Sequence, residues 1–134
     1  MADRRMQILE GAGALFGAVG YRAVTMEAAA AAARVSKATL YKHFPDKDAL
    51  FRAIADEFTD RTRRVVAAEL LLPGSIEDRV ARALAARHRM VFEAVDGSPH
   101  ALELMSAKAR LAHTSVAVID SGIMAIVIGY HRPW

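Results

Sequence analysis

Cysteine is absent from this chain of 134 residues. Without cysteine the chain has no disulfide, no thiolate nucleophile and no thiolate ligand for zinc, and we expect it in the reducing cytoplasm. The first ten residues, MADRRMQILE, carry charges where a signal peptide needs an apolar core, so secretion is not expected. The apolar segment 116–130 is too short and too interrupted to span a membrane.

Sequence motifs of the common enzyme classes are also missing. The chain has no Gly-rich phosphate loop, no H-E-x-x-H and no G-x-S-x-G. His88, His100 and His113 lack the spacing of metal ligands, and we interpret them as ordinary surface or core histidines. The sequence therefore predicts a protein that is not an enzyme and that holds no metal and no cofactor.

Positive charge is concentrated in the first half of the sequence. Residues 1–64 hold eleven Lys and Arg against eight Asp and Glu, whereas residues 65–134 hold seven of each, so the net charge of +3 arises in the first half. Such a local excess favours a surface that binds a polyanion. Four of these cations lie close together in the sequence, with one acid among them: Arg34, Lys37, Lys42 and Lys47.

Apolar residues recur at helical spacing along most of the chain, and no alternating strand pattern appears before residue 115. The pattern predicts an all-α protein. Thr25, Ser36, Asp46 and Ser75 are placed to cap helices, and Gly20 is placed to end the first one in a left-handed turn. The predicted helices run over residues 3–19, 26–33, 37–44, 47–72 and 76–95, the fourth being stopped by Pro73-Gly74.

The two longest predicted helices each carry an apolar stripe that we expect to be buried. In the fourth helix the stripe consists of Leu50, Phe51, Ile54, Phe58, Val65, Val66 and Leu70. In the fifth helix it consists of Ile76, Val80, Leu84, Val91 and Val95.

The stretch EAAAAAARVSKATLYKHF, residues 27–44, joins six alanines to a short capped helix. Alanine has the highest helix propensity and leaves room for a neighbouring helix to pack closely. In the capped helix that follows the alanines, Leu40 and Phe44 share a buried face. Ala38 and Lys42 lie on the opposite face, flanked by Thr39 and Tyr41. This arrangement is typical of a helix-turn-helix, whose second helix enters the major groove of DNA.

The longer stretch LFGAVGYRAVTMEAAAAAARVSKATLYKHFPDKDALF resembles the N-terminal DNA-binding domain of the TetR (tetracycline-repressor-like) family. The submotifs LF, GY, a capping Thr, VSK, TLY, HF and K-x-A-L occur at the family's distances. The resemblance extends over residues 5–54. It implies a homodimeric transcription regulator, usually a repressor, whose helical second domain binds a small apolar effector and whose dimer binds a palindromic operator in double-stranded DNA.

The resemblance also implies which residues meet DNA. The positions that match phosphate contacts are Thr25, Lys37, Tyr41, His43 and Lys47, and those that can face bases are Ala38, Thr39 and Lys42. Ser36 caps the reading helix and joins them as a DNA-binding residue. Two positions depart from the family pattern, because Arg34 stands where glycine is usual and Ala29 where a bulky aliphatic residue is usual.

The expected organisation is a three-helix head, residues 1–48, joined by a long helix to a partial effector-binding and dimerisation region, residues 49–134. This second region is shorter than is typical of the family. The alternative is a truncated family member that does not dimerise and acts as a weak DNA binder or as an interaction partner. The segment 116–130 is expected to be either a buried dimer or core segment or an exposed, aggregation-prone strand.

Overall fold

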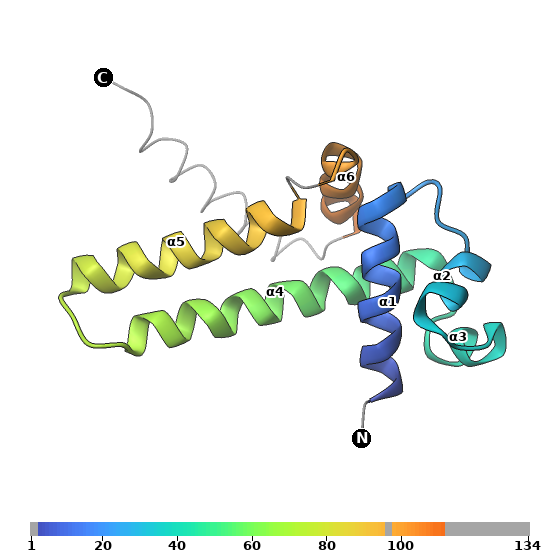
Figure 1. Cartoon of the computed structure of the whole chain (residues 1–134), viewed down its shortest axis with the longest axis horizontal. Helices are drawn as coiled ribbons and strands as arrows, with labels where there is room; N and C mark the ends of the chain where they lie inside the picture. Colours follow the sequence, from blue (N-terminus) through green and yellow to red (C-terminus); the bar gives the residue numbers. More distant parts are fainter. Residues whose placement is uncertain (1–2, 96–97, 112–134) are drawn as a thin grey trace.

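The computed structural model describes residues 3–95 and 98–111, and this part of the chain folds into six α-helices (Figure 1). The all-α prediction is therefore confirmed for the described residues. The predictions for segment 116–130 and for His113 concern residues outside the described ranges. The helices are α1 (Arg4–Val19), α2 (Met26–Ala33), α3 (Lys37–His43), α4 (Lys47–Leu71), α5 (Ile76–Val95) and α6 (Ala101–Leu111).

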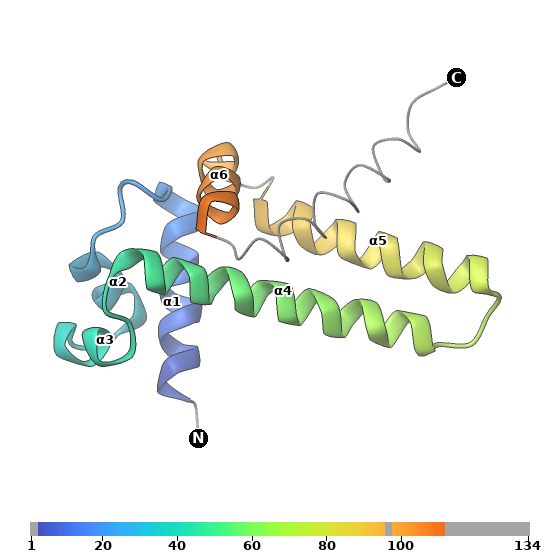
Figure 2. The same cartoon turned by 180° about the vertical axis from the view of Figure 1, so that it is seen from behind.

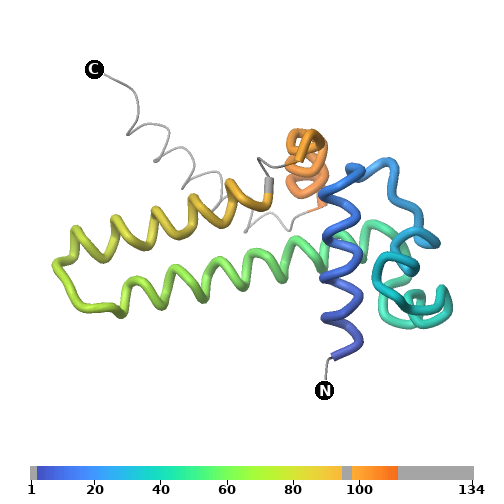
Figure 3. The backbone as a smooth tube through the Cα atoms, in the orientation of Figure 1, coloured from blue at the N-terminus to red at the C-terminus, as the bar shows by residue number. Residues whose placement is uncertain are grey.

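The long helix α4 organises the arrangement of the other helices. Helices α1, α2 and α3 gather at one end of α4, and α5 returns antiparallel beside α4, which Figures 1 and 2 show from opposite sides. The tube in Figure 3 shows the α4–α5 hairpin, with the turn that joins its two helices at the opposite end of α4 from α3. Helix α6 lies against the C-terminal end of α1. Across the described ranges, no helix combines the length and the apolar character that crossing a lipid bilayer requires.

The predicted helix ends agree closely with the structure because they depend on local signals. Thr25 accepts from Ala28 N at 3.1 Å, Asp46 Oδ1 accepts from Ala49 N at 2.8 Å, and Ser75 Oγ accepts from Asp78 N at 3.1 Å. The predicted turn at Gly20 is wrong in its detail. Its φ of 84° is positive, but its ψ of 171° belongs to an extended region that is accessible almost exclusively to glycine.

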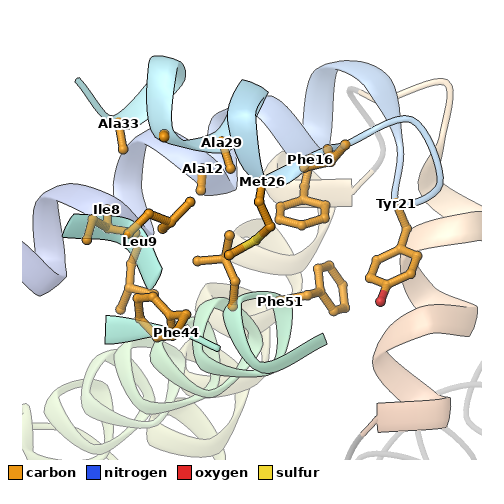
Figure 4. Packing of buried hydrophobic residues seen from close by; sticks show 14 of the residues in the cluster. Ile8, Leu9, Ala12, Phe16, Tyr21, Met26, Ala29, Ala33, Phe44 and Phe51 are labelled. Atoms are coloured by element: carbon orange, nitrogen blue, oxygen red, sulfur yellow. The ribbon is translucent and has the colours of Figure 1, made fainter. Parts of the chain in front are cut away.

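A single buried cluster holds the head on the first turns of α4 (Figure 4). Phe16 stacks on Tyr21 with ring centroids 5.8 Å apart, and Phe51 packs edge-on against both rings at 5.1 and 5.2 Å. The cluster crosses the predicted domain boundary at residue 48, since Leu50 and Phe51 are as buried as the residues of α1. The first turns of α4 are thus part of the head's core.

The prediction for the buried face of α5 is wrong at the first three of its five positions. Ile76, Val80 and Leu84 are 75%, 44% and 44% exposed, whereas Ala83 and Ala86 are buried. The helix is rotated so that these small side chains face the packed side, because alanine allows two antiparallel helix backbones to approach closely. Leu70, a member of the predicted buried stripe of α4, is likewise exposed, at 40%.

Helix α6 is fixed to the head through backbone groups. Ser98 Oγ donates to the Gly17 carbonyl oxygen at 2.6 Å, and Glu103 Oε1 accepts from Arg22 N at 2.6 Å. A Cβ on Gly20 would lie 2.5 Å from Glu103 Oε2. The loop after α1 therefore lies directly against the start of α6.

Helices α1 and α2 approach each other so closely at Gly11 that a side chain there would collide with the backbone. A Cβ on Gly11 would lie 2.6 Å from Ala33 Cα and 2.7 Å from the Ala32 carbonyl oxygen. Gly11 therefore allows α1 to pack closely against the last alanines of α2, a contact that the sequence did not predict.

This contact makes Gly11→Ala a sharp test of the α1–α2 packing. We expect the free energy of unfolding to fall by about 1–3 kcal/mol, because the added methyl group overpacks two backbones. Gly17→Ala in the same helix is the matched control, since a Cβ there meets nothing within 4 Å. The control should gain up to about 1 kcal/mol from helix propensity. Urea unfolding of both variants checks this, and an equal response would contradict the close approach.

Candidate nucleic-acid interface

The turn between α2 and α3 sets the direction of the second helix. Arg34, which stands where the resembled family usually has glycine, adopts φ 58° and ψ 43°, a left-handed conformation that glycine favours. Its amide donates to Ala31 O at 3.1 Å, and Val35 N donates to Ala30 O at 3.0 Å. These bonds satisfy carbonyl groups at the end of α2 and direct the chain into α3.

Helix α3 has one buried face and one exposed face. Leu40 and Phe44 are buried in the core, and the Arg5 guanidinium lies 5.5 Å from the centre of the Phe44 ring. The opposite side is open to solvent and includes Tyr41, which is 43% exposed. The exposed predicted site residues of this helix are Lys37, Ala38, Tyr41, Lys42 and His43.

The predicted hydroxyl contacts have structural partners. Ser36 Oγ accepts from Thr39 N at 3.0 Å and donates to Thr39 Oγ1 at 2.8 Å, so the two side chains form the N-terminal cap of α3. Thr39 is half-buried, whereas Ser36 and Thr25 are exposed. Ser36 and Thr25 are accessible at the starts of α3 and α2, and Thr39 is the least accessible of the three.

Lys37 is paired with an acid that the sequence reading did not single out. Its Nζ donates to Glu27 Oε1 at 2.5 Å and lies 5.9 Å from the Tyr41 ring centre. The hydrogen bond from Lys37 holds the pKa of Glu27 below its ordinary value, and the bond to Glu27 raises the pKa of Lys37. Both shifts favour the charged forms of the pair.

Lys42 and Lys47 differ in their surroundings. Lys42 is exposed and forms no hydrogen bond or ion pair with the residues that the structure describes. Lys47 is half-buried, and its Nζ donates to Tyr21 O at 3.0 Å and lies 4.5 Å from the centre of the Tyr21 ring. Lys42 is therefore the more available cation, and Lys47 also ties α4 to the loop after α1.

Three residues that shape this surface were missed from the sequence. Gln7 Nε2 donates to Ala33 O at 2.9 Å at the end of α2, and Arg5 lies over Phe44. Glu27 pairs with Lys37 across the turn. A glycine inside a helix often marks close packing against a neighbour. Gly11 therefore indicated that this part of α1, which includes Gln7, lies against another helix. No local spacing rule connects residues 27 and 37.

Comparison with known proteins identifies the head. Residues 8–54 match the family described as "Bacterial regulatory proteins, tetR family". Over these residues the chain is similar to the tetR family. The match includes α2, the turn and α3, so the resemblance predicted from the sequence is confirmed for this part of the chain.

Two curated relatives are HTH-type transcriptional repressors by name. The chain is 41% identical over 81 residues to the HTH-type transcriptional repressor Rv1474c of Mycobacterium tuberculosis, covering 60% of this chain and 43% of that protein. It is 39% identical over 67 residues to the HTH-type transcriptional repressor AcnR of Corynebacterium diphtheriae, covering 50% of this chain and 35% of that protein. The chain thus spans less than half the length of each relative.

A solved structure agrees with the fold. A tetR family transcription regulator from Shewanella sp. PV-4 superposes with a TM-score of 0.62 over 88% of this chain and 66% of that one, at 20% identity. At that identity the likeness concerns the fold alone. It extends beyond the head into the helices that follow.

The left-handed Arg34 predicts a stabilising substitution. Arg34→Gly should raise the free energy of unfolding by up to about 1 kcal/mol, because glycine has no Cβ to strain this conformation. Arg34→Lys is the control, since it keeps both the cation and the Cβ and should leave stability almost unchanged. Thermal unfolding of the two variants measures the difference. A lower melting temperature for Arg34→Gly would mean that the Arg34 side chain makes a stabilising contact.

Proposed function

We propose that this chain binds double-stranded DNA with sequence preference and regulates transcription as a repressor. The observation that carries the proposal is the two-sided α3, which buries Leu40 and Phe44 while it exposes Ala38 and Lys42. A helix held in this way presents short and cationic side chains at the scale of a major groove. The names of the two curated relatives support the repressor role.

Each exposed residue has a role in this proposal. Ala38 and Lys42 face base edges, and the half-buried Thr39 borders them. Thr25, Ser36, Lys37, Tyr41 and His43 meet phosphate oxygens, which orient the protein on the duplex without reading its sequence. Lys47 reaches a phosphate only if its ammonium leaves, or shares, the Tyr21 carbonyl group, so we assign it a smaller contribution than Lys42.

The proposal includes a homodimer on a palindromic operator. Two reading helices must lie about 34 Å apart to enter successive major grooves on one side of the duplex. We also propose two regions, a head of residues 1–48 and an effector-binding and dimerisation region of residues 49–134. A small apolar effector releases the repressor, and the protein is located in the cytoplasm. The exposed apolar side chains of α5, among them Leu84 and Phe92, support a partner or ligand on that helix.

The proposal predicts DNA binding that depends strongly on salt and on Lys42. Affinity for a duplex should fall with a slope of about −0.9 in log K against log salt for each neutralised phosphate. In selection from a random duplex library, Lys42→Ala should lose about 1–3 kcal/mol of discrimination at the bases it reads. Arg89→Ala removes an exposed cation from α5 and is the control that should change neither result.

Two outcomes would contradict this assignment. An affinity that stays constant between low and moderate salt would reject the cationic surface. An unchanged selected sequence for Lys42→Ala would reject base reading by Lys42. Light scattering at micromolar concentration tests the dimer separately, because a monomer that still binds DNA weakly would favour the non-dimerising alternative.

A further inference from the structure

Glu27 places a negative charge next to Lys37 on the proposed DNA-binding surface. It lies in the first turn of α2, and its carboxylate accepts a 2.5 Å hydrogen bond from Lys37 at the start of α3. The Lys37 and Glu27 side chains are 56% and 63% exposed. A DNA phosphate that approaches Lys37 therefore meets an ammonium that already has an anionic partner, and a carboxylate that repels the phosphate.

The head does not depend on this ion pair for its shape. The α2–α3 turn is held by the Arg34 and Val35 amides, the start of α3 by the Ser36 cap, and α3 itself by the burial of Leu40. Exposed ion pairs generally contribute little to folding stability, because water screens the charges and two long side chains must be ordered. The main effect of the pair should thus fall on binding.

We propose that Glu27 sets the DNA affinity of this protein by competing with phosphate for the Lys37 ammonium. The inference rests on the proposed DNA binding and adds a residue that opposes it. In the unbound protein Lys37 is neutralised internally, so its contact with a phosphate contributes less than a solvated lysine would. Binding requires Lys37 to exchange one anion for another or to hold both close together.

The Lys37 ammonium also lies near the Tyr41 ring, which limits where the competition takes place. The 5.9 Å approach to the ring centre keeps the ammonium on the exposed side of α3, next to Glu27. A phosphate bound by Lys37 therefore has to come near the Glu27 carboxylate. Substituting an amide for that carboxylate removes the competitor while it preserves the size of the side chain.

The competition has a defined signature in the salt dependence of binding. Replacing Glu27 by glutamine makes Lys37 available to one further phosphate, so the slope of log K against log salt should steepen by about 0.9. If the two proteins bind equally at 1 M salt, that slope corresponds to roughly eightfold tighter binding at 0.1 M salt.

A double-mutant cycle separates this competition from simple repulsion between Glu27 and DNA. The full chain is titrated with a 20-base-pair duplex of random sequence at several salt concentrations, as wild type, Glu27→Gln, Lys37→Met and the double variant. Glu93→Gln removes an exposed carboxylate from α5 and is the matched control. We expect Glu27→Gln to increase the affinity of the wild type for the duplex by more than Glu93→Gln does. In the Lys37→Met protein, Glu27→Gln should increase the affinity by no more than Glu93→Gln increases that of the wild type. Circular dichroism melting checks that all variants fold.

Each other outcome overturns the inference. A gain for Glu27→Gln no larger than for Glu93→Gln means that Glu27 does not compete. The same gain in the Lys37→Met background means that Glu27 repels DNA directly. Weaker binding by Glu27→Gln means that Glu27 orients Lys37 or contacts DNA itself. Failure of the wild type to bind duplex DNA at low salt would overturn the proposed function and this inference with it. The wild-type titration alone shows this, so failure of the proposed function is distinguished from failure of the inference.

Discussion

The orientation of α3 depends on how closely α1 approaches the end of α2. At Gly11 the two helices meet backbone to backbone, near the alanines that precede the turn. Once α1 is there, Gln7 reaches the Ala33 carbonyl group and Arg5 reaches the ring of Phe44. The C-terminal ends of α2 and α3 are therefore both positioned by α1, and any change in the spacing of α1 and α2 would tilt the exposed face of α3.

Most helix ends of this fold are predictable from the sequence because their signals are local. The capping hydroxyl or carboxylate of Thr25, Ser36 and Asp46 lies within three residues of the amide it accepts from. The buried face of α5 was not predictable in the same way. Its sequence contains one stripe of large apolar residues and another of alanines, and which one is covered depends on how closely α4 packs. Helical periodicity identifies apolar side chains but not the helix that covers them.

In the candidate site, too, local features are predictable from the sequence and contacts between distant residues are not. The exposed face of α3 and the left-handed Arg34 follow from a motif read within a few residues. The partner of Lys37 and the position of Lys47 do not, because their contacts join residues 10 and 26 positions apart in the sequence. The sequence predicts phosphate contacts for Lys37 and Lys47 but not their partners within the protein, which the tertiary fold supplies: a carboxylate for Lys37 and a carbonyl group for Lys47.

The attachment of α6 to the head has a consequence for how this chain can vary. The bond from Ser98 ends on the Gly17 carbonyl group, which every amino acid provides, and the bond to Glu103 comes from the Arg22 amide, which every amino acid except proline provides. Substitutions at residues 17 and 22 can therefore accumulate without loss of these bonds, while residues 98 and 103 must keep a donor and an acceptor. Evolution would constrain only one side of this contact, so paired substitutions would not reveal it.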